Sequence, residues 1–198
     1  MNIIERVKNI LIAPKTEWEV INGETATPGS LLMTYVLPLS IIGAAGGLLK
    51  GLFVSGTLLG GFGMKYFIVT ALVALIASLA AYFITVIFVD LLAPSFGSEK
   101  NIGKSAQLVA YAGTASYVGG LLSFIPFIGW LISLAAWGYG IYLMYLGIGP
   151  LKKTPEDKKV LYMLVVYVIL IVLYFILIAI LGAVLYAALG LTAVSMFR

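Results

Sequence analysis

The sequence predicts an all-α integral membrane protein with five transmembrane helices, preceded by a short amphipathic helix at the membrane surface. Of its 198 residues, 62% are hydrophobic and 10% are charged, with a mean hydropathy of +1.12, whereas soluble domains carry about 25% charged residues. The apolar residues also lie in runs long enough for a bilayer, which a helix crosses with about 20 residues. We expect a cytoplasmic N-terminal segment over 1–30 and a membrane domain over 31–198.

The longest central run, residues 106–149, holds no charged side chain over 44 residues. This is about twice the length of one span, so we expect the run to cross twice. Pro126 and Gly129 interrupt it, and proline disfavours helix both at its own position and at the residue before it. The pattern predicts a helical hairpin with spans at about 106–124 and 128–149.

Three further runs complete the expected membrane domain. The first span covers about 31–49, after Thr27-Pro-Gly-Ser30, and the second covers about 66–89 and ends at Asp90. The last apolar run is 38 residues long, too long for one straight span. We therefore assign its start, 160–181, as the fifth span, with Gly182 and Gly190 allowing the remainder to bend or lie at the far interface.

The glycine-rich segment 51–64 is uncharged but too short and broken to span. Irregular backbone cannot face lipid at depth, so we expect it at the interface or covered by protein. A re-entrant loop that lines a cavity is the functional alternative.

The N-terminal segment has the pattern of an amphipathic helix. Asn2 and Glu5 fit a capping box, apolar residues recur at helical spacing and Pro14 ends the pattern. A second capping-box pattern, Thr16 to Glu19, precedes another short helix. We expect the segment to lie on the membrane surface through Arg6, Lys8, Lys15 and Trp18. In the alternative interpretation it packs on the loops of its own domain.

Small residues at helical spacing predict where the spans pack closely. Lipid-embedded helices approach through such residues because lipid gives no hydrophobic drive for association. We expect packing mainly within one chain, although the first of these faces could also serve a dimer. The positions are Gly43, Gly47 and Gly51 in the first span, Ser116 and Gly120 in the third, and Ser133 and Gly140 in the fourth.

Basic residues set the expected orientation. With five spans and the N-terminus inside, nine basic residues face the cytoplasm and three face outward, and basic residues in short loops favour the inner side. The outer three are Lys50, Lys65 and Arg198. We expect a multi-pass protein of the bacterial cytoplasmic membrane, with its N-terminus cytoplasmic and its C-terminus outside.

The polar inventory argues against an enzyme. The chain has no histidine and no cysteine, which removes the usual general base, the thiol nucleophile and nearly all transition-metal ligand sets. No GxxxxGK[ST] sequence occurs. We expect no catalytic residue, no cofactor and no metal. The expected partners are the bilayer, anionic lipid headgroups and other membrane or cytoplasmic proteins or a second copy, but not nucleic acid.

Asp90 is the one acid close to hydrocarbon, and such residues are candidates for functional sites. We group Asp90 with Lys100, Lys104 and Tyr111 as a candidate ion or ligand site, and we expect a lysine of the following loop to lie within reach of the carboxylate. In the simpler interpretation, Asp90 is an interfacial charge satisfied by water and a lysine. In the other, it binds a coupling ion or proton.

Two stretches resemble bacterial members of the Yip (Ypt-interacting protein) family: NIIERVKNILIAPKTEWEVI, and AYAGTASYVGGLLSFIPFIGWLISLAAWGYGIYLMYLGIGPLKKTPEDKK. The resemblance implies five spans, a cytosolic N-terminus and a C-terminus just past the last span. Eukaryotic relatives are associated with Rab-type GTPases and vesicle trafficking through an Asp-Leu-Tyr-Gly-Pro motif. That motif is missing from residues 1–30, so Rab binding is not carried over.

Three functional hypotheses follow. The first is a non-enzymatic membrane scaffold that organises lipids or binds partner proteins. The second is a small transporter or channel with a cavity between the second, third and fourth spans, using Asp90 and the 51–64 segment. The third is an intramembrane enzyme, which the polar inventory disfavours.

Overall fold

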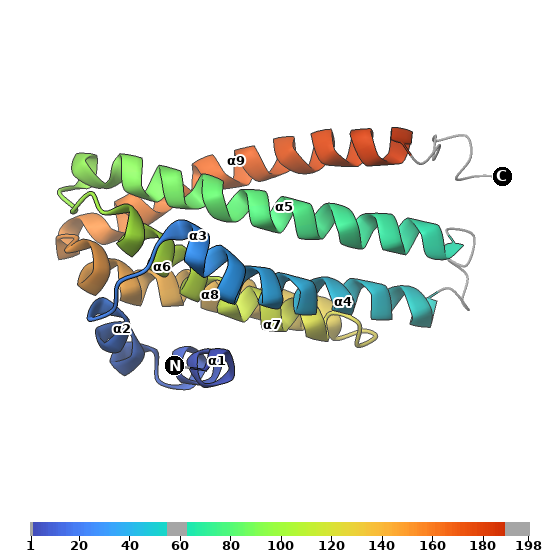
Figure 1. The fold of residues 1–198 in the computed structure, drawn as a ribbon, viewed down its shortest axis with the longest axis horizontal. Helices are drawn as coiled ribbons and strands as arrows, with labels where there is room; N and C mark the ends of the chain where they lie inside the picture. Colours follow the sequence, from blue (N-terminus) through green and yellow to red (C-terminus); the bar gives the residue numbers. More distant parts are fainter. Residues whose placement is uncertain (1, 55–62, 189–198) are drawn as a thin grey trace.

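The computed structural model describes residues 2–54 and 63–188, which form helices joined by short connections, with no strand among them (Figure 1). Helices α4, α5, α7, α8 and α9 run along the long axis, and α1 and α2 lie beside them. The helices are α1 Ile3–Ile12, α2 Pro14–Asn22, α3 Pro28–Leu31, α4 Leu37–Val54, α5 Gly63–Leu92, α6 Ile102–Ala112, α7 Thr114–Leu122, α8 Gly129–Lys152 and α9 Glu156–Ala188.

Four helical segments of the described chain are long and apolar enough to cross a membrane: Pro28–Gly51, Phe67–Phe96, Gly129–Lys152 and Glu156–Val184. The stretch predicted as the third span, 106–124, is instead two consecutive helices, α6 and α7, separated at Gly113. The Thr114 hydroxyl donates to the Tyr111 carbonyl oxygen at 2.7 Å. A threonine side chain that bonds the backbone in this way competes with the regular helix ladder.

The predicted helical hairpin is present, with its turn between Leu122 and Gly129. Its second helix does not end at Gly149, as the sequence predicted, but includes Pro150 and continues to Lys152. Helices α5 and α9 likewise extend beyond the predicted spans, because hydropathy detects only the part that suits hydrocarbon. Glu156 and Asp157 in the first turn of α9 favour its early start.

Two predictions about irregular segments also change. The residues after 181 continue the last helix, because α9 runs through Gly182 to Ala188 without a break. The ends of the 51–64 segment belong to α4 and α5. The rest of that segment, 55–62, and the region containing Gly190 lie outside the described residues.

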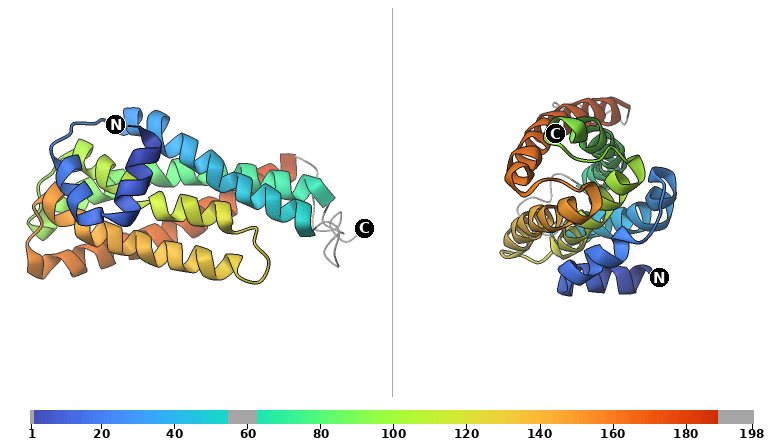
Figure 2. Two further views of the ribbon diagram at one scale, coloured as in Figure 1. Left: turned by 90° about the horizontal axis from the view of Figure 1, so that it is seen from below. Right: turned by 90° about the vertical axis from the view of Figure 1, so that its left-hand side faces the viewer.

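The N-terminal helices form a hairpin against one side of the bundle, with α1 lying across the bundle axis (Figure 2). The Asn2 side chain caps α1 by accepting from the Ile4 amide at 3.1 Å. The predicted start of α2 at Thr16 is wrong, since α2 begins at Pro14. Proline suits the first helical position because the amide it lacks would have no partner there.

The first membrane helix contains a wider turn. Thr27 and Ser30 form the capping box that starts α3, and a π-helix over Leu32–Val36 leads into α4. The Leu37 amide donates to the Leu32 carbonyl, a bond to the fifth residue back. Pro38 explains the change of pitch, because its ring clashes with the carbonyl four residues earlier in a regular helix.

Glycines bring α4 against α7, but not all of the predicted ones. A Cβ on Gly43 would lie 3.3 Å from the Tyr117 carbonyl oxygen, and one on Gly46 would lie 2.1 Å from that of Gly120. Gly47 faces open space instead. The close approach within the chain therefore uses Gly43 and Gly46, whereas Gly51 lies against Phe67 of α5.

The second predicted small-residue contact joins α7 to α8. A Cβ on Gly140 would lie 3.2 Å from the Ala112 carbonyl oxygen and 3.6 Å from the Ser116 hydroxyl. Gly119 of α7, which the sequence pattern did not single out, lies against Ala136 of α8. A Cβ on Gly119 would also lie 3.7 Å from the Ser133 Cα, so Ser133 is at this contact, while its hydroxyl donates to the Gly129 carbonyl of its own helix.

Adjacent glycines provide a test of this packing. We expect Gly46→Ala to destabilise the protein by about 1–3 kcal/mol, because the new methyl group meets backbone that cannot move away cheaply. Gly47→Ala is the matched control and should be neutral or stabilising by up to about 1 kcal/mol through helix propensity. Unfolding in detergent measures both, and equal effects of the two would contradict the packing described.

Candidate functional site

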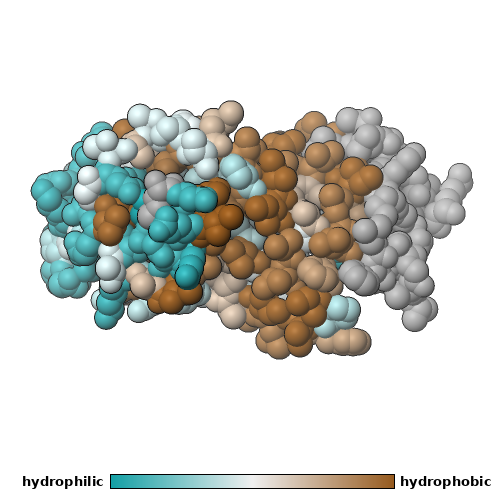
Figure 3. Space-filling model, turned by 60° about the horizontal axis from the view of Figure 1, so that its bottom comes forward, coloured by the Kyte–Doolittle hydropathy of each residue, from teal (hydrophilic) through white to brown (hydrophobic). Residues whose placement is uncertain are grey.

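The polar groups of the described chain gather at one end of the bundle (Figure 3). This end contains α1, α2, the connection from Ala93 to Asn101 and the connection from α8 to α9. The face of the bundle beyond it is covered by apolar side chains. Two networks of buried polar side chains lie at or beside this end.

The first network surrounds Asp90, which is 6% exposed, and Lys152, which is fully buried. The Lys152 ammonium lies 3.0 Å from an Asp90 carboxylate oxygen and 2.7 Å from the Ser105 hydroxyl. The same oxygen accepts from the Ser105 hydroxyl at 3.0 Å and from the Asn101 amide at 2.8 Å. The network thus joins the ends of α5 and α8 to the start of α6.

The expected lysine partner of Asp90 was wrong. Lys100 is exposed, and the Lys104 ammonium donates to backbone carbonyls of the N-terminal segment, including Asn22 at 2.6 Å and Glu24 at 2.8 Å. Lys152 was missed because the sequence placed it in a loop after Gly149-Pro150.

The second network fastens the N-terminal hairpin to the bundle. Arg6 is 5% exposed and pairs with Glu17 at 2.5 Å and with Glu24. Its guanidinium carbon lies 5.1 Å from the centre of the Tyr111 ring. Tyr35, from the π-helix, packs edge-on against that ring. A polar cavity of about 500 Å³ lies between these groups.

Two of the four expected membrane-surface residues are therefore inside the protein. Trp18 is fully buried in the core, and Arg6 is nearly so, whereas Lys8 and Lys15 are exposed. The interpretation in which the segment packs on its own domain is correct for these two buried residues. The exposed side of α1 carries Ile4 and Ile12 beside Lys8.

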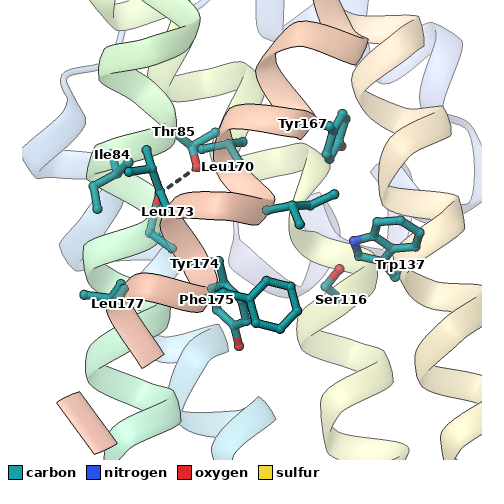
Figure 4. A pocket seen from close by; sticks show the side chains of 12 residues that line it. Ile84, Thr85, Ser116, Trp137, Tyr167, Leu170, Leu173, Tyr174, Phe175 and Leu177 are labelled. Atoms are coloured by element: carbon teal, nitrogen blue, oxygen red, sulfur yellow. Dashed lines mark hydrogen bonds between the residues drawn. The ribbon is translucent and has the colours of Figure 1, made fainter. Parts of the chain in front are cut away.

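Two apolar cavities adjoin each other on the opposite side of α8. One of about 490 Å³ lies between α5, α7, α8 and α9 (Figure 4), and one of about 460 Å³ lies between α8 and α9. Trp137, Tyr167 and Ile171 line both. Asp90 lines none of the three cavities, and the described residues contain no cluster of acids that could hold a metal ion.

Long apolar helices with their polar networks gathered toward one end define a polytopic α-helical membrane protein. A model of the Yip1 domain family matches residues 8–180. The chain therefore belongs to the Yip1 domain family, whose members are generally non-enzymatic membrane proteins, which confirms the resemblance at the level of the family. Comparisons with curated proteins and with solved structures found no match.

Proposed function

We propose that this protein crosses the membrane five times with its N-terminus in the cytoplasm, and that it acts as a non-enzymatic scaffold for lipids or partner proteins. The proposal rests on one observation, the pairing of the buried charged side chains with each other or with nearby charges. All five buried charged side chains of the described residues, Arg6, Glu17, Asp90, Lys152 and Lys159, form ion pairs within the chain. Such pairs suit a fixed assembly better than a site that must release an ion.

Helices α6 and α7 support one further crossing, in addition to those of the four long apolar helices. Together they extend over residues 102–122 beside α8, which is about the length a span requires. The positive-inside rule supports the orientation, because the polar end holds nine basic residues. The resemblance of the opening and the hairpin to bacterial relatives supports a bacterial cytoplasmic membrane.

The absence of cysteine from the chain makes the topology directly testable. Phe127 lies in the turn between α7 and α8 and is 93% exposed, so we expect Phe127→Cys to react with an impermeant maleimide added outside intact cells. Lys158→Cys, at the start of α9, should react only after the membrane is permeabilised. Labelling of both from the same side would contradict five spans with the N-terminus inside.

The scaffold role predicts a preference for curved membrane, because the N-terminal hairpin adds bulk at one end of the bundle only. The protein, labelled at Lys8→Cys and reconstituted in giant vesicles, should reach a higher density on a pulled membrane tubule than on the flat membrane. A lipid-anchored dye gives the reference ratio. Equal densities of protein and dye would count against this role.

The transporter alternative has less support, because Asp90 is already held by Lys152, Ser105 and Asn101. Liposomes loaded with a pH-sensitive dye distinguish the two functions. We expect no proton flux above that of empty liposomes when an ion gradient is imposed. A flux that requires Asp90 in a folded protein would reverse the preference.

A further inference from the structure

The two apolar cavities form one groove, here called the α8–α9 groove. Its side chains come mostly from facing sides of α8 and α9, with contributions from α5 and α7 (Figure 4). Helix α9 packs mainly along α5 and diverges from α8 away from their short connection (Figures 1 and 2). This divergence leaves the groove along the seam between the two helices.

The groove opens on the side of the bundle that lies at membrane depth. Trp137 is 47% exposed and Phe175 is 69% exposed, although both line the groove. Apolar side chains that line an empty space lose the dispersion contacts that atoms in that space would provide. In a bilayer such a space is therefore filled, either by lipid or by another protein segment.

The size of the groove decides between these occupants. Its lining on α9 extends from Val160 to Leu177, a length of about 27 Å for a helix rising 1.5 Å per residue. A helix about 10 Å wide and equally long would need roughly 2,000 Å³. The two cavities hold about 490 and 460 Å³, so an extended acyl chain fits within the groove, whereas most of a helix would lie outside it.

A cation lies at the end of the groove nearest the polar end. The Lys159 ammonium is 5.8 Å from the centre of the Tyr145 ring, and both Tyr145 and Val160 line the groove. Lys159 pairs with Glu156, whose side chain is 80% exposed. The Lys159 side chain itself is only 11% exposed. Its carboxylate partner lies at the surface, where an anionic group at headgroup depth can compete with Glu156 for the ammonium.

We propose that the α8–α9 groove binds one glycerophospholipid, with an acyl chain against Trp137 and Ile171 and the phosphate at Lys159. A lipid in one leaflet reaches roughly 20 Å from the headgroup to the bilayer centre, so its chain extends along most of the groove. This inference depends on residence in the membrane, and it stands or falls independently of the scaffold role.

Quenching of tryptophan fluorescence tests the site. The purified protein in detergent is titrated with phosphatidylglycerol brominated on its acyl chains. We expect quenching that saturates at one lipid per chain and that disappears in Trp137→Phe. Trp130→Phe is the matched control, since Trp130 is also on α8 and 64% exposed but lines neither cavity, and it should keep the saturable component.

Two glycines provide the binding-defective variant and its control. A Cβ on Gly138 or on Gly47 would meet nothing within 4 Å, so both positions accept a larger residue without a clash at the backbone. Only Gly138 lines the groove. Gly138→Leu should weaken lipid binding roughly tenfold or more, while Gly47→Leu leaves it unchanged.

The lysine gives a second test, which acts on the headgroup end of the groove. Lys159→Gln should weaken binding of phosphatidylglycerol, whereas Lys158→Gln, at the neighbouring position, should not. Quenching that rises without saturation, or saturable quenching unaffected by Gly138→Leu and Lys159→Gln, would overturn the proposal. So would a dimer of the wild type that Gly138→Leu converts to monomer, because a second copy would then occupy the groove.

Discussion

Asp90→Asn is expected to destabilise the protein by about 3–5 kcal/mol, because it leaves the Lys152 ammonium as an uncompensated buried charge. Lys152 is fully buried, and its carboxylate partner lies 3.0 Å away. Asparagine keeps the shape of the side chain, so the lost charge is the main change. Denaturant unfolding of the protein in micelles measures the effect.

The double variant Asp90→Asn/Lys152→Met is the control that separates charge from shape. It removes both charges, and replacement of a buried pair by groups of similar volume is often neutral, so it should recover most of the stability lost in Asp90→Asn. If Asp90→Asn unfolds like the wild type, the ion pair does not hold the helix ends together. Ion-flux experiments on Asp90 should include the double variant, since a misfolded protein also loses flux.

The fold follows from the sequence where one strong local signal decides it. Uncharged runs of sufficient length identify the four long apolar helices of the described residues, and the break at Pro126 places the turn between α7 and α8. Helix ends were predicted less well. Lys152 continues α8 because its ammonium finds Asp90 and Ser105 from other helices, and a local pattern contains no information about that meeting.

The faces of the helices show the same limit. Four-residue spacing selected Gly43 and Gly47, whereas the structure uses Gly43 and Gly46 against α7. Residues three apart and residues four apart both lie on one face of a helix. Only the position of Gly120 on the partner helix decides whether Gly46 or Gly47 makes the contact. Trp18 was likewise placed at the membrane surface, because its burial depends on contacts with residues far along the chain.

Trp18→Ala is the second change with a large expected effect, about 3–5 kcal/mol, as for other buried tryptophans. The ring is fully buried and packs edge-on against Tyr111. A Cβ on Gly147 would lie 2.7 Å from a ring carbon, so the indole rests directly on the backbone of α8. Loss of this contact should detach the α1–α2 hairpin while the membrane helices stay folded.

A single cysteine reports the detachment, since the wild-type chain has none. Ile10 belongs to α1 and is fully buried. The thiol of Ile10→Cys should therefore react slowly with maleimide in the otherwise wild-type protein, and many times faster when Trp18→Ala is added. Val20→Ala, on the exposed side of the same helix as Trp18, is the control and should leave the thiol protected. A thiol that stays protected in Trp18→Ala would mean that the Arg6 ion pairs and the Lys104 hydrogen bonds suffice to hold the hairpin. Exposure of the thiol would instead show that the indole supplies most of the docking free energy, with the polar contacts fixing only where the hairpin sits.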